Sequence, residues 1–449
     1  MSSAVYWCER ALVDGIIDEG VVVTIENGRF GSVHGGVSAP PDGSIRLRGV
    51  TIPGLANAHS HAFHRALRSR TQSGGGTFWT WRQLMFSAAQ RLDPDLYHRL
   101  ARATLAEMAL AGITVVGEFH YLHHQPDGTP YAEANAMGSA LLAAASEAGV
   151  RMTLLDTLYL YGGLDTTGYR PVEGVQARYA DQTADTWANR VNELEAGPGQ
   201  QIGAAIHSVR AVDPGSMRAV VDWADQRSAP IHAHVSEQPA ENEQCVGYHR
   251  TTPTGVLDEV GALGPHFSAV HATHLSDGDV QAMAASGGGV CVCPTTERDL
   301  GDGIGPTAQL AAAGVDMSLG SDSHAVIDLL EEARGLELDE RLRSGERGVH
   351  SPTELLSMAT VHGHAALGWA DAGRIAPGCR ADLVTIRLDS VRTAGTTTDT
   401  AAEAVVFAAS AADVSNVIVD GRSIVVDGKH VSIDVATELH ASIVDLMDE

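Results

Sequence analysis

The middle of the chain alternates short apolar runs with longer amphipathic segments, and this alternation limits the folds that it can adopt. The eight apolar runs begin at Thr51, Ile113, Met152, Ile202, Pro230, Ser268, Val290 and Val315. Strands and helices that alternate in this way predict βα units around a parallel sheet. Eight units within about 320 residues suit a closed (β/α)8 barrel of the TIM type. We therefore predict such a barrel for residues 53–370.

Both ends of the chain are rich in strand patterns, whereas the middle is not. Short strands are predicted at 11–17, 21–26, 44–52, 381–386, 405–407, 417–419 and 423–426. Asp-Gly pairs at 420–421 and 427–428 flank the last run and indicate hairpin turns. We expect a small β-sandwich domain built from residues 1–52 and 371–449, with the barrel inserted between these segments.

Three segments between the strands carry helix signals. Asp93 and Pro94 supply an N-cap and a first-turn proline to a helix that should end at Gly112. Residues 351–354, Ser-Pro-Thr-Glu, form a capping box with proline at the first helical position. Residues 328–343 predict a charged amphipathic helix whose simplest place is the solvated outer face.

Charge and cysteine content exclude several classes of function. The chain has 449 residues, with 30 basic and 56 acidic side chains and a formal net charge of −26. Binding of nucleic acid or of an anionic membrane requires a basic surface, so neither is expected. The five cysteines are too scattered for a disulfide framework. Neither a signal peptide nor a transmembrane stretch is recognisable, so we expect a cytoplasmic protein.

Histidines and acids lie where four of the predicted strands end. His59 and His61 follow the first run, His234 lies in the fifth, His271 in the sixth, and Asp322 follows the eighth. The carboxyl ends of barrel strands meet at one face, where active sites lie. A His-x-His pair alone is more often structural, and an aspartate after Gly-Ser is equally consistent with a helix cap. Their joint occurrence in this order predicts a metal site.

This set of motifs resembles the amidohydrolase superfamily. Members of that superfamily carry His-x-His, a strand-five histidine, a strand-six histidine and a strand-eight aspartate. The phrases PGLANAH at 53–59 and GRIAPGCRADL at 373–383 are also similar. The resemblance spans nearly the whole chain. It implies a (β/α)8 barrel with a β-sandwich made from both termini, the same fold class as predicted above.

The variant of the site points to one metal ion. Superfamily members with two metals commonly need a carboxylated lysine on strand four, and residues 202–210 contain no lysine. His234 followed by Glu237 resembles the His-x-x-Glu of the one-metal deaminases. The implied ligands of a single ion are His59, His61, His234 and Asp322. Zn²⁺ suits this donor set with an open position for water, and Fe²⁺ is the alternative.

The chemistry of such a site gives roles to three residues. A bound divalent ion lowers the pKa of water to about 7. Asp322 would accept the proton of that water, and His271 would orient or stabilise the nucleophile. Glu237 would carry protons to the departing nitrogen, so that ammonia leaves a tetrahedral carbon.

Longer phrases are similar to the N-formimidoyl-L-glutamate deiminases of histidine degradation. They lie at 78–82, 117–124, 127–131, 207–210, 293–303 and 320–324. The resemblance implies hydrolysis of N-formimidoyl-L-glutamate to N-formyl-L-glutamate and ammonia. It also implies substrate contacts from Arg82, Tyr121, His207 and Arg210. Independently, the two arginines suit a substrate with two carboxylates, because a guanidinium binds a carboxylate in a bidentate manner.

One position departs from the pattern of this family. His64 stands where that pattern has glutamine, three residues after the second metal histidine. An imidazole can still donate to a substrate carboxylate, so His64 is included among the expected substrate contacts. We interpret the histidines at 120, 123 and 124 as loop residues around Tyr121 rather than as a second metal site.

Two other functions remain open. A one-metal deaminase of an aromatic heterocycle would need an aromatic stacking pocket, with neutral polar groups in place of Arg82 and Arg210. A barrel that only binds a ligand would have lost a metal ligand or Glu237, and none is missing. The expected partner is therefore a small dianionic substrate, and the superfamily resemblance implies a homodimer.

Overall fold

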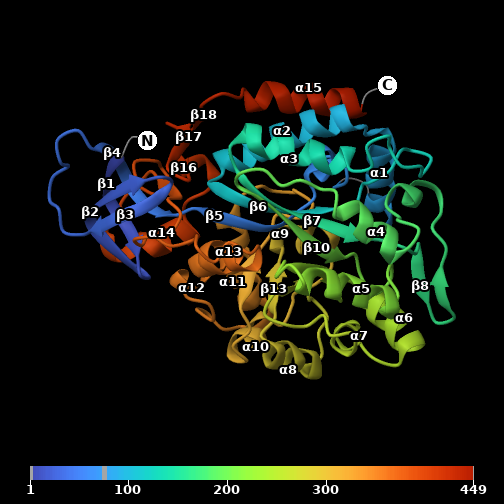
Figure 1. Ribbon diagram of the computed structural model, residues 1–449. Helices are drawn as coiled ribbons and strands as arrows, with labels where there is room; N and C mark the ends of the chain where they lie inside the picture. Colours follow the sequence, from blue (N-terminus) through green and yellow to red (C-terminus); the bar gives the residue numbers. More distant parts are fainter. Residues whose placement is uncertain (1–3, 73–77, 448–449) are drawn as a thin grey trace.

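A parallel eight-stranded sheet forms the centre of the molecule in the computed structural model, which describes residues 4–72 and 78–447 (Figure 1). Its strands follow one another in chain order: β5 (Leu55–Ser60), β6 (Ile113–His120), β7 (Arg151–Leu158), β10 (Gln200–Ile206), β11 (Ile231–Val235), β12 (Phe267–His271), β13 (Gly289–Val292) and β14 (Met317–Leu319). A parallel bridge between Ser60 and Asp322 brings the last strand beside the first and nearly closes the barrel. Every residue of β5, β6, β7, β11 and β12 is buried, as expected for strands covered on both faces.

A second eight-stranded sheet combines the two ends of the chain. Its order is β18-β17-β16-β15-β4-β1-β2-β3. The N-terminal strands are β1 (Ala4–Val13), β2 (Ile16–Glu26), β3 (Arg29–His34) and β4 (Ile45–Pro53), and the C-terminal ones are β15 (Leu383–Ile386), β16 (Val414–Val419), β17 (Arg422–Val426) and β18 (Lys429–His430). Antiparallel pairing of β4 with β15 joins the two halves. The predicted fold class, a (β/α)8 barrel with a small β-sandwich domain from both termini, is confirmed as a nearly closed barrel with a separate sheet built from the two ends of the chain.

Three of the predicted strands are wrong in detail. The run at 11–17 is broken by the turn at Asp14 and Gly15, whose φ angles are +48° and +79°, so the chain reverses between β1 and β2. Residues 405–407 belong to helix α14 (Ala401–Phe407), because so short an apolar run does not distinguish a strand from a helix. Thr51 belongs to β4, and the first barrel strand begins only at Leu55.

Helices surround the barrel and follow its strands (Figure 1). They are α1 (Phe78–Arg91), α2 (Pro94–Leu110), α3 (Ala136–Ala148), α4 (Ala184–Val191), α5 (Pro214–Asp225), α6 (Pro239–His249), α7 (Pro253–Glu259), α8 (Asp277–Ser286), α9 (Pro294–Leu300), α10 (Thr307–Ala312), α11 (Leu329–Ser344), α12 (Pro352–Ser357), α13 (Gly363–Ala366) and α15 (Val435–Met447). A short hairpin, β8 (Gly163–Asp165) and β9 (Gly168–Arg170), lies outside both sheets. Within the described ranges, no helix is both long and apolar enough to cross a membrane.

The predicted helix starts are present, but one helix is less exposed than expected. Asp93 caps α2 by accepting a hydrogen bond from the backbone N–H of Leu96 at 2.8 Å, and the capping box at 351–354 opens α12. In α11, by contrast, Glu332, Glu337 and Glu340 are fully buried. This helix is therefore not simply a solvated outer face, because its acidic side chains accept hydrogen bonds inside the protein.

The C-terminal helix lies on the barrel rather than on the second sheet. Figure 1 shows α15 running along α2. Arg99 and Arg102 of α2 form ion pairs with Asp445 and Glu438 of α15. The chain thus returns from the second sheet to the barrel before it ends.

A buried ion pair joins the barrel to the second sheet. Nη1 of Arg151, the first residue of β7, lies 2.8 Å from Oδ1 of Asp382, which directly precedes β15, and 3.2 Å from Oδ1 of Asp420. Arg151 is 2 % exposed and Asp382 1 %. Burial raises the pKa of Asp382, but Arg151 outweighs this effect and holds that pKa well below its usual range. The pair is therefore charged and fully desolvated.

Replacement of Asp382 should destabilise the protein strongly. Asp382→Ala leaves the buried guanidinium of Arg151 without its main partner, so we expect the free energy of unfolding to fall by about 3–5 kcal/mol. Denaturant-induced unfolding measures this change. Asp389→Ala is the matched control, because its ion pair with Arg387 is exposed and should contribute nothing measurable. Equal effects of the two substitutions would contradict the role of the buried pair.

Candidate metal centre and ligand pocket

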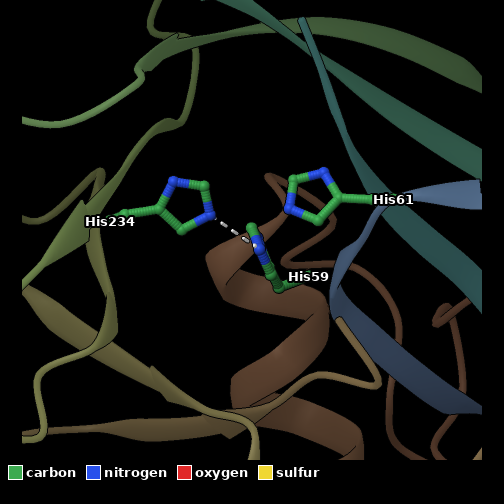
Figure 2. A group of neighbouring side chains, drawn as sticks. All are labelled: His59, His61 and His234. Atoms are coloured by element: carbon green, nitrogen blue, oxygen red, sulfur yellow. Dashed lines mark hydrogen bonds between the residues drawn. The ribbon is translucent and has the colours of Figure 1, made fainter. Parts of the chain in front are cut away.

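The four predicted metal ligands converge at the carboxyl ends of the barrel strands. Figure 2 shows the imidazoles of His59, His61 and His234 pointing toward one another. Nε2 of His59 lies 3.2 Å from Nε2 of His234 and 3.4 Å from Oδ1 of Asp322. Nε2 of His61 lies 3.3 Å from the same oxygen of Asp322. Three ring nitrogens and one carboxylate oxygen thus face one buried space.

The protonation of these histidines fits a bound cation. Nδ1 of His61 donates to the carbonyl of Phe119, and Nδ1 of His234 donates to that of His207, both at 3.0 Å. A carbonyl only accepts, so Nε2 of each ring keeps its lone pair and presents it to the shared space. Burial lowers the pKa of His59 to about 3 and also lowers those of His61 and His234. Neutral imidazoles and one carboxylate are the donors that a divalent transition metal prefers.

The backbone is strained where it presents these side chains. Asp322 has a φ angle of +38° and His271 one of +69°, although neither is glycine. Such conformations cost about 1–3 kcal/mol each and are concentrated at functional sites. They turn the chain directly after β14 and at the end of β12, where both side chains face the metal centre.

His271 lies among three carboxylates beside the metal centre. Its Nε2 is 3.8 Å from both Oδ2 of Asp322 and Oε1 of Glu237, and its Nδ1 is 3.3 Å from Oε1 of Glu297. Burial alone lowers the pKa of His271, but these carboxylates raise it well above its usual value. Nε2 of His271 therefore lies next to the two carboxylates at the metal centre, Asp322 and Glu237. Glu297 lies within the phrase at 293–303, yet nothing in its spacing indicates that it contacts His271.

A pocket opens above the metal centre. All the predicted site residues except His59 line this pocket: His61, His64, Arg82, Tyr121, His207, Arg210, His234, Glu237, His271 and Asp322. The structure therefore brings the predicted catalytic, metal and substrate groups into one cavity. The side chains of residues 78 and 79, in the phrase at 78–82, lie outside the described part.

Aromatic side chains that were not predicted complete the wall of the pocket. Tyr159 follows β7, and its hydroxyl accepts a hydrogen bond from Nε2 of Gln176 at 3.0 Å. Tyr179 and Phe86 lie beside it, and the guanidinium carbon of Arg82 is 4.9 Å from the ring centroid of Phe86. These residues belong to loops and to α1, and no periodic pattern in the chain marks them. The pocket is thus aromatic and cationic at once.

His64 is bound to another pocket residue. Its Nε2 lies 2.9 Å from the hydroxyl of Tyr121, and its buried Nδ1 has no hydrogen-bond partner among the described residues. His64 therefore forms one polar unit with Tyr121 at the wall of the pocket.

A second buried cluster contains His120, His123 and Asp156. Both oxygens of Asp156 already accept hydrogen bonds from Arg190, at 2.8 and 2.9 Å, and one also accepts from Trp187 at 3.0 Å. Nε2 of His123 faces the carbonyl of Thr157 at 2.9 Å. The carboxylate is thus neutralised by an arginine, which leaves little attraction for a cation.

Fold and site together define a metal-dependent hydrolase built on a (β/α)8 barrel. The sequence profile of the amidohydrolase family matches residues 50–424 of this chain. The chain belongs to that family.

Three comparisons describe its relatives. A formimidoylglutamate deiminase of Pseudomonas aeruginosa is 36% identical over 360 residues, which are 78% of each chain. An 8-oxoguanine deaminase of the same species is 30% identical over 381 residues, 83% of each chain. The crystal structure of an amidohydrolase from Brucella melitensis superposes with a TM-score of 0.91, at 31% identity and 99% coverage of both chains. Both named relatives are deaminases, but they are named for different substrates.

Replacement of His234 should remove the metal, whereas replacement of His232, on the same strand, should leave the metal bound. In His234→Ala we expect metal content to fall by more than about tenfold, because even outer-shell losses weaken metal binding by about 10–100-fold. His232→Gln is the matched control, since His232 lies on the same strand but faces the carbonyl of Ala366 at 3.0 Å. Elemental analysis of the dialysed proteins measures the result. Full metal content in His234→Ala would exclude this residue as a ligand.

Proposed function

We propose that this chain hydrolyses N-formimidoyl-L-glutamate to N-formyl-L-glutamate and ammonia. One divalent ion, for which Zn²⁺ is the best match, would be held by His59, His61, His234 and Asp322. The observation that carries the proposal is the presence of two arginines in the cavity that also contains Glu237 and Asp322. The similarity to the formimidoylglutamate deiminase of Pseudomonas aeruginosa supports the same substrate.

The arginines supply what a dianionic substrate needs. Arg82, on α1, and Arg210, after β10, bring two positive charges into a pocket of a protein whose net charge is −26. Each guanidinium can bind one carboxylate of the glutamate moiety through two charge-assisted hydrogen bonds. Tyr121, His207 and His64 line the same cavity and would complete the polar contacts.

The protein groups around the metal centre can move the protons of the reaction. A divalent ion bound there supplies the Lewis acidity that activates water at neutral pH. Asp322 would accept a proton from the attacking water, and the protonated His271 would hold the developing oxyanion. Glu237, 3.8 Å from His271, would pass the proton to the amino nitrogen of the tetrahedral carbon. Asp322 would then take the remaining hydroxyl proton, the oxygen's electron pair would form the formyl carbonyl, and the carbon–nitrogen bond would break with release of ammonia.

A second candidate is deamination of an aromatic heterocycle. The aromatic wall formed by Phe86, Tyr159 and Tyr179 favours it, as does the similarity to an 8-oxoguanine deaminase. The two arginines argue against it, because a neutral ring offers no carboxylate to which two guanidinium groups could bind. A substrate panel separates the two candidates.

The metal-loaded protein should release ammonia from N-formimidoyl-L-glutamate much faster than from N-formimidoyl-L-aspartate, 8-oxoguanine or adenosine. Arg82→Ala and Arg210→Ala should each lower kcat/KM by about 100-fold or more with metal content unchanged, since each removes a charged partner of the substrate. Arg218→Ala, at an exposed position of α5, is the control. Preference for a purine, with both arginine variants unimpaired, would favour the second candidate.

Glu237→Gln should separate chemistry from metal binding. The amide keeps the size of the side chain but cannot shuttle a proton, so we expect kcat to fall by about 10²–10⁴-fold. Metal content should stay at the level of the unaltered protein, because Glu237 is not among the four ligands. Ammonia release and elemental analysis of the same sample measure both quantities. Retained turnover would assign the proton transfer to another group.

A further inference from the structure

A carboxylate that does not line the pocket is buried beside Arg210. Glu241, in the first turn of α6, is 2 % exposed, and neither of its carboxylate oxygens has a hydrogen-bond partner among the described residues. The cation within 4 Å of it is Arg210, whose Nε lies 3.7 Å from Oε2 of Glu241. A buried carboxylate is unfavourable unless a positive charge compensates it. Burial raises the pKa of Glu241, and the charge of Arg210 opposes this rise. The ionisation of Glu241 therefore depends on Arg210.

Arg210 in turn lies near two carboxylates. Its Nη2 is 3.9 Å from Oε2 of Glu237, and its Nε is 3.7 Å from Oε2 of Glu241. Both separations exceed hydrogen-bond length, and Nε of Arg210 is buried without a hydrogen-bond partner in the described structure. The guanidinium is thus attracted by two carboxylates without being bonded by either. Its N–H groups therefore stay able to form two hydrogen bonds with an incoming carboxylate.

Glu241 is held in place by the residues on both sides of it. Nδ2 of Asn242 donates to the carbonyl of His274 at 2.7 Å, and Nε2 of Gln238 donates to Oδ1 of Asp302. Pro239 begins the helix between them. These bonds fix the first turn of α6 to the loops after β12 and α9. The carboxylate of Glu241 is therefore presented to Arg210 by a rigid support.

Removal of Glu241 would take away one of the two carboxylates that attract Arg210. Without Glu241, Glu237 would be the nearest carboxylate to the guanidinium, and the two groups would close to hydrogen-bond distance. Such a pair would occupy the edge of Arg210 that a substrate carboxylate needs and would also engage the proposed proton carrier. The attraction between Arg210 and Glu241 opposes the formation of this pair.

We propose that Glu241 is a positioning residue, which holds Arg210 toward a ligand carboxylate and away from Glu237. The proposal rests on the proposed function, in which Arg210 binds a carboxylate of the substrate. Glu241 does not line the pocket, so its effect on the ligand passes through Arg210.

A double-mutant cycle tests this role. Glu241→Gln, Arg210→Ala and the double variant are compared with the parent, all metal-loaded, by calorimetric binding of N-formyl-L-glutamate and by KM and kcat for N-formimidoyl-L-glutamate. Glu241→Gln should raise Kd and KM about tenfold and change kcat less than KM. In the Arg210→Ala background it should change neither constant further. Glu243→Gln is the matched control, because Glu243 is exposed on the same helix, and it should match the parent.

The other possible outcomes contradict either the positioning role of Glu241 or the binding of a carboxylate by Arg210. Binding as tight as the parent's in Glu241→Gln, or an equal loss with and without Arg210, would refute the positioning role and leave the arginine clamp intact. If Arg210→Ala binds like the parent, or the parent binds no dicarboxylate, the clamp itself fails and the role of Glu241 falls with it. Should Glu241→Gln not fold, Glu241→Asp replaces it. The shorter acid keeps the charge but moves it away from Arg210, so a smaller rise in Kd, about threefold, is expected, and an unchanged Kd refutes the role.

Discussion

The same contact between the first and last strands closes the barrel and positions the metal centre. The backbone N–H of Asp322 donates to the carbonyl of His59 at 3.0 Å, and the N–H of His61 donates to the carbonyl of Asp322 at 3.3 Å. These bonds join the end of β5 to the chain just beyond β14, the first and last strands of the parallel sheet. Three of the four proposed ligands therefore take their positions from the step that closes the barrel. Any distortion of that closure would move the ligands apart.

The opposite end of the barrel carries the attachment to the second sheet. Gly54 separates β4 from β5, and a Cβ atom there would lie 2.3 Å from Oγ1 of Thr114 and 2.7 Å from Cβ of Asp382. The ion pair of Arg151 with Asp382 lies at the same end, at the start of β7. Residues at this face of a (β/α)8 barrel serve stability, whereas the carboxyl ends of the strands serve chemistry. Stability and chemistry are thus served by different residues at opposite ends of the barrel.

The convergence of the proposed metal ligands could be predicted from the sequence because strand geometry determines where these side chains point. His59 and His61 alternate along one strand, and the order of strands places His234, His271 and Asp322 at the same rim. Glu241, Glu297 and Tyr159 could not be predicted in this way. Their places depend on how helices and loops pack above the barrel, which no period of two or 3.6 residues encodes. The hairpin at Asp14 and the helix at 401–407 were missed because local apolar patterns of a few residues suit either strand or turn, or strand or helix.

The division between strands and loops also bears on substrate choice within the family. The metal centre is built from strand ends, whereas Arg82 belongs to α1 and Tyr121, Tyr159 and Arg210 to segments that follow β6, β7 and β10. Loops tolerate changes of sequence and length that buried strands do not. A set of loops that delivers two guanidinium groups over the metal centre therefore suits a dicarboxylate, while the same barrel with neutral loops would suit a heterocycle. Such an arrangement permits relatives that are named for different substrates, formimidoylglutamate and 8-oxoguanine. Under the proposed function, the arginines above the centre, rather than the centre itself, determine the choice of substrate.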